Sequence, residues 1–239
     1  METILKNEKG FALALMMALL PILIGLILVT FAIVSFVQID LKLHQICRSE
    51  SLKGQEAVAP LLKSLLALNP LALKLKLELI QAKAQAVSGN PAALARLAQV
   101  EAKVLKLITQ QQQLIKQSNL LLLKAHTSNQ IKLWNEKDQT LRTIPLFKSE
   151  LQVLSSKVPT LAVRPDSIDR PPTYSPAENF SNRQALEQRW QYRLSITKPL
   201  QPFLTGNYVF EKSCAVTLKE ENSKWFPQMK RDRSLSKSH

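Results

Sequence analysis

The hydrophobic pattern of this chain is dominated by one continuous apolar segment close to its N-terminus. From Phe11 to Val37, 27 consecutive positions carry no charged side chain. About 20 apolar helical residues cross the hydrocarbon core of a bilayer. At ~1.5 Å per residue the segment is ~40 Å long, which exceeds the ~30 Å core. The pattern therefore predicts a single membrane-spanning helix, tilted or kinked at Pro21 to fit the bilayer.

A cleaved signal peptide is the alternative interpretation of this segment. A signal peptide has an apolar core of about 7–15 residues and ends at a small-x-small cleavage site. The apolar core here is much longer, and residues 38–43, with the sequence QIDLKL, contain no such site. We therefore expect the segment to be retained as an anchor.

Downstream of the anchor, from Gln38 to about residue 139, the sequence predicts helices. Asn69-Pro70 predicts a break, and the sequence SGNP at 88–91 predicts a turn followed by a helix start. Residues 71–79, LALKLKLEL, alternate as a strand would. Because Leu, Ala, Lys and Glu all favour helix, we predict helix there.

The last of these helices is expected to run from about Pro91 to His126 or further. Apolar side chains recur along it every seven residues, with Gln111 and Ser118 as polar interruptions. Such a repeat is typical of a helical hairpin within one chain, or of a coiled coil with a partner. The apolar members are Leu97, Val100, Val104, Leu107, Leu114, Leu121 and Ala125.

Near residue 140 prolines become frequent and the pattern changes to that of strands. Strands are predicted at 151–154, 160–163, 189–197 and 207–219, with an extended loop at 164–182. The predicted fold class is α+β. Its parts are a short flank (1–10), a transmembrane helix (11–37), a helical hairpin or coiled-coil stem (38–139), a small antiparallel β-rich domain (140–229) and a disordered basic tail (230–239).

The net charge of +14, from 32 Lys and Arg against 18 Asp and Glu, widens the range of partners. A scattered basic surface is compatible with simple solvation, nucleic acid, anionic lipid headgroups or anionic envelope polymers. Trp190 and Tyr192, among arginines, have the spacing of one strand face. They either fill the core of the sheet, which we favour, or stack nucleic-acid bases.

Candidate catalytic and metal-binding residues are sparse. His44, His126 and His239 are far apart and show no metal-ligand spacing. The five glycines form no phosphate-binding loop, and no G-x-S-x-G sequence is present. Asp166 and Asp169 form no recognisable acid–base pair. We therefore expect no enzyme activity, cofactor or metal.

The two cysteines, Cys47 and Cys214, are candidates for a disulfide that would connect the base of the anchor helix to the C-terminal strands. Such a bond requires an oxidising compartment, whereas in the cytosol both residues would be thiols. The choice depends on topology. Two Lys or Arg residues precede the anchor and three follow it closely, which slightly favours a cytoplasmic body.

Residues 9–25, KGFALALMMALLPILIG, resemble the N-terminus of TadE/TadG-like proteins of the Tad pilus-assembly family. The resemblance covers about 30 of the 239 residues. It implies a cytoplasmic N-terminus and an extracytoplasmic body, opposite to the charge count, and we follow the resemblance. The matching positions are Gly10, Ala14, Ala18, Leu19, Pro21 and Leu23.

Type IV pilins are a second, weaker resemblance. Their basic stretch ends in a Gly before a Phe that opens the apolar helix, and Gly10 and Phe11 match that junction as a possible processing site. Pilins carry a Glu five positions into the mature helix, where this chain has Leu15. The departure argues against prepilin-type processing and ordinary filament assembly.

These features favour a membrane-anchored structural or assembly protein of a bacterial pilus or secretion-type envelope system. It would be a single-pass protein of the inner membrane with a periplasmic C-terminal domain, and its partners would be the bilayer, envelope proteins or further copies. The alternative is a membrane-tethered basic module that binds anionic lipid, an anionic polymer or, less favoured, nucleic acid. Helix packing in the membrane would use Ala12, Ala14, Ala18, Pro21 and Gly25.

Overall fold

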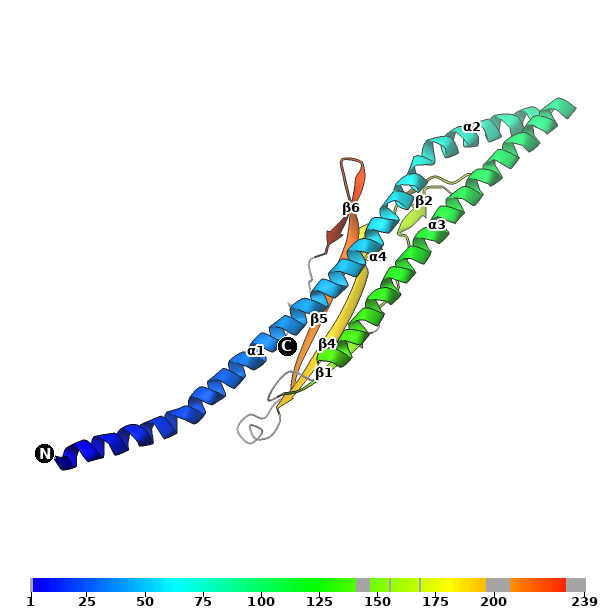
Figure 1. The fold of residues 1–239 in the computed structure, drawn as a ribbon. Helices are drawn as coiled ribbons and strands as arrows, with labels where there is room; N and C mark the ends of the chain where they lie inside the picture. Colours follow the sequence, from blue (N-terminus) through cyan, green and yellow to red (C-terminus); the bar gives the residue numbers. More distant parts are fainter. Residues whose placement is uncertain (1, 141–146, 155, 168, 197–206, 231–239) are drawn as a thin grey trace. The chain divides into compact units, whose positions relative to one another are not determined.

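The computed structural model describes residues 2–140, 147–154, 156–167, 169–196 and 207–230, and the side chains of most of them from Leu15 onward (Figure 1). Three long helices precede a set of strands, as the α+β prediction requires. In chain order the elements are α1 (Glu2–Ala67), α2 (Asn69–Ala86), α3 (Pro91–Thr140), β1 (Phe147–Leu154), β2 (Val163–Pro165), β3 (Tyr174–Pro176), α4 (Phe180–Arg183), β4 (Leu186–Ile196), β5 (Asn207–Glu221) and β6 (Lys224–Met229).

Helix α1 is one uninterrupted helix of 66 residues that contains the whole apolar segment. It passes through Pro21 and continues past Val37, so the first helix extends beyond the predicted membrane span. It ends at Ala67, and α2 starts at Asn69 with a proline in its first turn. The predicted break at Asn69-Pro70 is therefore confirmed.

Helix α2 includes residues 71–79, so the prediction of helix over strand is confirmed. The turn that follows contains Gly89 at φ +72°, a left-handed conformation that glycine adopts without strain. Asn90 then caps α3, because its side-chain oxygen accepts a hydrogen bond from the backbone N–H of Ala92 at 3.0 Å. Figure 1 shows α2 and α3 running side by side. Their shared core consists of Ala72, Leu75, Leu79, Ala82, Val100, Val104 and Leu107.

The register of the seven-residue repeat predicted for α3 is wrong beyond Ser118. Leu121 and Ala125 are only half-buried, whereas the next residues, Leu122 and His126, are buried. Buried positions recur instead every eleven residues, at Val100, Gln111, Leu122 and Leu133. Eleven residues make three turns of ~3.67 residues, close to the natural 3.6, so an almost straight helix keeps one face inward.

The strands form a four-stranded sheet in the order β1-β4-β5-β6 and a two-stranded sheet of β2 and β3. β5 and β6 are antiparallel, paired from Val216 with Met229 to Glu221 with Lys224, and their turn places Asn222 and Ser223 at positive φ. Three corrections follow for the sequence predictions. β6 was not expected, the strand predicted at 160–163 begins only at Val163 as β2, and the expected loop 164–182 contains β3 and the start of α4. Of the expected tail, all but Lys230 lies outside the described residues.

Helices and strands are combined within each compact unit of this chain. The chain divides into two compact units that each combine helix and strand: Met1–Gln45, Leu133–Val153 and Trp190–Lys212 in the first, and Ile46–Lys132, Leu154–Arg189 and Ser213–His239 in the second. In the second unit one core joins α1, α3 and the strands. Its members are Val58, Leu62, Leu65, Leu122, Leu161, Leu186 and Leu218.

Candidate functional site: the anchor helix and the clamped hairpin

The apolar segment of α1 presents its side chains outward over most of its length. Large apolar residues from Leu15 to Phe31 are exposed, for example Met16 at 74% and Leu26 at 67%. By length and composition, this helix is the one candidate membrane span among the described residues. Water-facing apolar surface of this extent is rare on a soluble protein and marks a site of interaction with lipid or protein.

Of the residues predicted to pack membrane helices, Ala18 and Pro21 are exposed and Gly25 is half-buried. An added Cβ at Gly25 would meet no atom within 4 Å, so nothing in this chain requires a glycine there. The side chains of Ala12 and Ala14, and of the possible processing site at Gly10 and Phe11, lie outside the described part.

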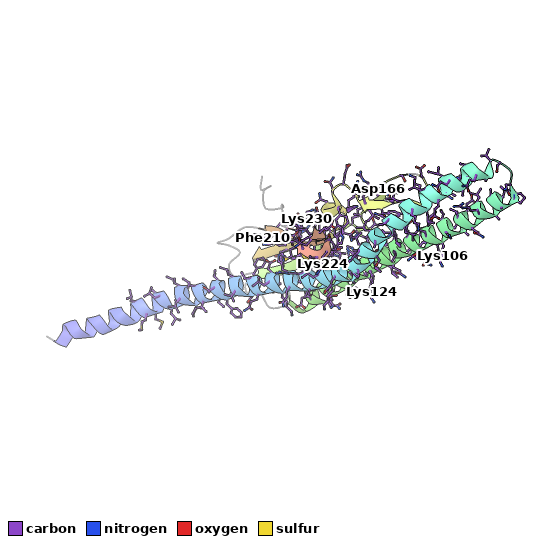
Figure 2. All side chains as sticks on the ribbon, turned by 90° about the horizontal axis from the view of Figure 1, so that it is seen from above. Lys106, Lys124, Asp166, Phe210, Lys224 and Lys230 are labelled. Carbon is purple, nitrogen blue, oxygen red and sulfur yellow. A yellow bond between two sulfur atoms is a disulfide. The ribbon has the colours of Figure 1, made fainter. Side chains whose placement is uncertain are left out.

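The end of the apolar segment contacts folded residues of the same unit. Ala32 is 2% exposed, and the Phe36 ring lies 5.0 Å from that of Tyr192 and 5.8 Å from that of Phe210, which is labelled in Figure 2. The Trp190 and Tyr192 side chains are buried, which confirms their predicted core role and leaves neither free to stack on a base.

A polar cluster around Asp40 follows the apolar segment directly. The Tyr192 hydroxyl donates a hydrogen bond to Asp40 Oδ1 at 3.2 Å, and Lys212 Nζ lies 3.7 Å from Asp40 Oδ2. Burial, reinforced by the Asp40 charge, raises the pKa of Tyr192 far above its usual value, so the phenol keeps its proton. The His44 ring lies 3.8 Å from the Asp40 carboxylate and packs edge-on against Trp190.

In the second unit a disulfide joins the two predicted cysteines, Cys47 of α1 and Cys214 of β5, whose Cα atoms are 6.4 Å apart. Helix α3 is attached at the same level. Asn129 Nδ2 donates hydrogen bonds to the Cys47 carbonyl at 3.2 Å and to Ser51 Oγ at 2.9 Å. We call this region, where α1, α3 and β5 are connected around the disulfide, the clamp.

An ion pair on the surface of α1 and α3 adds to the clamp. Lys132 Nζ lies 2.7 Å from Glu50 Oε1, and the Ser128 hydroxyl donates to Glu50 Oε2 at 3.0 Å. The hydrogen bond from Lys132 lowers the pKa of Glu50. Exposed ion pairs of this kind contribute only about 0–1 kcal/mol to the stability of a fold. This pair therefore adds little stability, and its main effect is on the register of the two helices.

Gly54 allows α1 and α3 to approach closely. A Cβ at this position would overlap the Cβ of Ala125 and would lie 2.9 Å from Cδ1 of Leu186. Real Cβ atoms do not come this close, so a glycine is required here. The sequence does show Gly54, but in a helical context it gives no sign of which helix it faces.

A buried amide network connects α1 to the strands next to Gly54. Gln55 Nε2 donates to the backbone carbonyls of Gln184 at 2.6 Å and Val216 at 3.1 Å. The side chain of Gln184 donates to Gln55 Oε1 at 3.3 Å and accepts from the Ala162 N–H at 2.9 Å. Both glutamines are fully buried. Because buried polar groups are costly unless paired, this network specifies one arrangement of helix and strands.

His126 and Gln188 form a second buried polar pair. Gln188 Nε2 donates to His126 Nδ1 at 3.0 Å, and the imidazole is 3% exposed. Burial lowers the pKa of His126, so the ring is neutral in the folded protein at neutral pH. Its partner is an amide, and this geometry is that of a structural histidine.

A shallow groove of about 330 Å³ lies between α1 and β6 in the same unit. It combines aromatic and proline side chains with two lysines, of which Lys224 is labelled in Figure 2. Among the described residues, no group of three or more His, Cys, Asp or Glu is placed to hold a metal ion. The groove is lined by Glu56, Ala59, Pro60, Lys63, Lys224, Trp225, Phe226 and Pro227.

No protein-family model, no curated protein and no solved structure matches this chain.

Proposed function

We propose that this protein is a membrane-anchored structural or assembly component of a bacterial pilus or secretion-type envelope system, acting through protein–protein contacts. The observation that carries the proposal is the exposed apolar length of α1, which continues without a break into a disulfide-clamped body. A helix of this kind fixes a folded body at a membrane. The body itself consists of packed helices and strands, which suits contact with other proteins.

The exposed length matches a bilayer better than the full apolar run does. Residues 32–37 include the buried Ala32 and the packed Phe36, which leaves 11–31 for lipid. Those 21 residues, counted from the sequence, rise ~31 Å, close to the ~30 Å hydrocarbon core. Neither strong tilt nor a kink at Pro21 is then needed.

The proposed location is the inner membrane, with the body in the periplasm. A disulfide persists in an oxidising compartment, and Cys47 and Cys214 lie in disulfide geometry. The resemblance of residues 9–25 to TadE/TadG-like proteins implies the same topology. Small side chains such as Ala18 and Gly25 let another membrane helix come close, whether from a further copy or from another envelope protein.

The test is a topology measurement in bacterial cells. A reporter active only in the periplasm, fused after His239, should be active, and Cys47 and Cys214 should resist alkylation until reductant is added. A Cys47→Ser variant provides the control, because it leaves one thiol that reacts without reductant. A cytoplasmic reporter with two free thiols would contradict the proposal and favour the tethered basic module.

A further inference from the structure

Helix α2 carries a second apolar stripe that faces away from α3. Its members are spaced by four, three, four and three residues, the spacing of coiled-coil core positions. They are strongly exposed: Leu73 at 54%, Leu77 at 64%, Ile80 at 57% and Val87 at 87%. We call Leu73, Leu77, Ile80, Ala84 and Val87 the outer stripe.

The outer stripe is the consequence of the strand-like alternation at 71–79. When alternating leucines are wound into a helix, they cannot all lie on one face. Ala72, Leu75, Leu79 and Ala82 face α3 and are buried, and Leu73 and Leu77 emerge on another side of the helix. Figure 2 shows side chains standing along both sides of α2. A single exposed leucine needs no explanation, but a continuous stripe over about three helical turns, which ends with Val87 at the C-cap of α2, does.

We propose that the outer stripe docks an amphipathic helix of a partner protein whose core-flanking positions are acidic. Helices recognise one another through apolar residues at i, i+3, i+4 and i+7, which is the pattern of the outer stripe. In coiled-coil terms Leu77 and Ala84 occupy a positions, and Leu73, Ile80 and Val87 occupy d positions. The inference deepens the proposed assembly function by naming its contact surface.

The charges beside the outer stripe select the partner. Three of the four e and g positions on α2 are lysines: Lys74, Lys76 and Lys83, with Gln81 as the fourth. Lys74 and Lys83 are exposed, while Lys76 is already paired with Asp169 at 2.8 Å. A second copy of α2 would offer these lysines no acidic residue at e or g. Glutamates at those positions of a partner helix would pair with them.

A lipid surface is a poorer occupant for the same stripe. Binding to a lipid surface depends on the buried apolar area and on anionic headgroups, and it does not require the regular four-three spacing of the outer stripe. That spacing matches the apolar face of a single helix.

The test uses the full-length protein in lipid nanodiscs and two fluorescent synthetic helices of about four heptads. Both peptides have leucine at a and d; one has glutamate at every e and g position and the other lysine. Fluorescence anisotropy should show the acidic peptide binding at least about tenfold more tightly than the basic one, with affinity falling as salt rises.

Substitutions assign the binding to the outer stripe. Leu77→Asp with Ile80→Asp should weaken binding of the acidic peptide by more than about tenfold, since both apolar contacts with the peptide are lost and a carboxylate replaces each of them. Leu105→Asp is the matched control, because Leu105 is a comparably exposed leucine on α3, at 58%. Lys74→Glu with Lys83→Glu should reverse the preference toward the basic peptide. Helical circular dichroism confirms that each variant is folded.

Four outcomes would overturn the inference. Equal affinity for the two peptides would remove the charge selection, and an equal loss from Leu105→Asp would remove the site. Dimers in mass photometry that Leu77→Asp abolishes would identify a second copy as the occupant, and binding to anionic vesicles lost in that variant would identify lipid. None of these results affects the periplasmic reporter, so this inference and the proposed function fail separately.

Discussion

The two ends of the helical hairpin in the second unit are built in different ways. Where α2 packs on the first part of α3, the core contains only Leu, Val and Ala side chains. In and beside the clamp, the buried residues instead include the polar Gln55, Asn129 and His126, a required Gly54 and the disulfide between α1 and β5. Apolar packing alone tolerates substitution and small shifts, whereas buried hydrogen bonds and tight contacts select one arrangement. We call α2 and the first part of α3, which pack on each other, the distal pair. The distal pair is suited to adapt to a partner, whereas the clamp is suited to hold its shape.

The largest expected effect comes from a Leu→Ala truncation, which should affect the stability of the two regions differently. Leu122→Ala, in the core next to the clamp, should cost about 3–5 kcal/mol and lower the midpoint of denaturant unfolding. Leu75→Ala, in the distal pair, should mainly speed amide hydrogen exchange in α2, because that end opens locally. The comparison would collapse if both variants lowered the global midpoint equally.

Leu121→Ala sharpens the same test. A seven-residue repeat would make Leu121 the core residue, but it is half-buried while Leu122 is fully buried. We expect its truncation to cost clearly less than that of Leu122. The reverse order would restore the seven-residue register.

Breaking the disulfide comes second in expected size. The bond closes a loop between residues 167 apart in sequence, and its loss should cost about 2–4 kcal/mol, mostly through the unfolded chain. Cys47→Ser with Cys214→Ser, compared with the wild type in oxidising and reducing buffer, measures this cost by denaturant unfolding. Hydrogen exchange in the distal pair should stay the same. A large rise there would show that the clamp also holds the far end.

Gly54 provides the third test. Gly54→Ala should destabilise by about 1–3 kcal/mol although alanine favours helix, since its Cβ overlaps that of Ala125. Ala125→Gly in the same chain should recover part of the loss by opening the space. Gly25→Ala is the control, because no atom lies within 4 Å of its added Cβ. A stabilising Gly54→Ala would show that the helices are free to separate.

Local chemistry made part of this fold predictable from sequence. Three signals are local in sequence: the apolar run, Asn69-Pro70 and the Gly89-Asn90 turn. Because each of them depends on neighbouring residues only, α1, α2 and α3 begin or end close to where predicted. The eleven-residue period was missed because the apolar residues up to Ser118 fit seven equally well, and the polar Gln111 and His126 on the buried face obscured the longer repeat.

The site was less predictable because it depends on contacts between distant segments. Cys47 and Cys214 were found as a pair because only two cysteines exist. Gln55 and Gln184 carry no such signal, since an isolated glutamine usually marks a solvated surface. β6 was missed because Pro227 disfavours a strand, yet this proline lies opposite Leu218 in the last strand of the sheet, where edge positions tolerate it.

The smallest expected effect concerns the pH dependence of the clamp. Burial lowers the pKa of His126 in the folded protein, so between that value and about 6.5 the unfolded chain binds a proton that the native state does not. Stability is therefore complete above pH ~6.5 and declines as the pH falls, by at most about 1.4 kcal/mol per pH unit. His126→Asn keeps an acceptor for Gln188 and should flatten the unfolding free energy between pH 7 and 5.5. Parallel profiles for wild type and variant would mean that the imidazole is not desolvated, and that the clamp is held by its amides and disulfide alone.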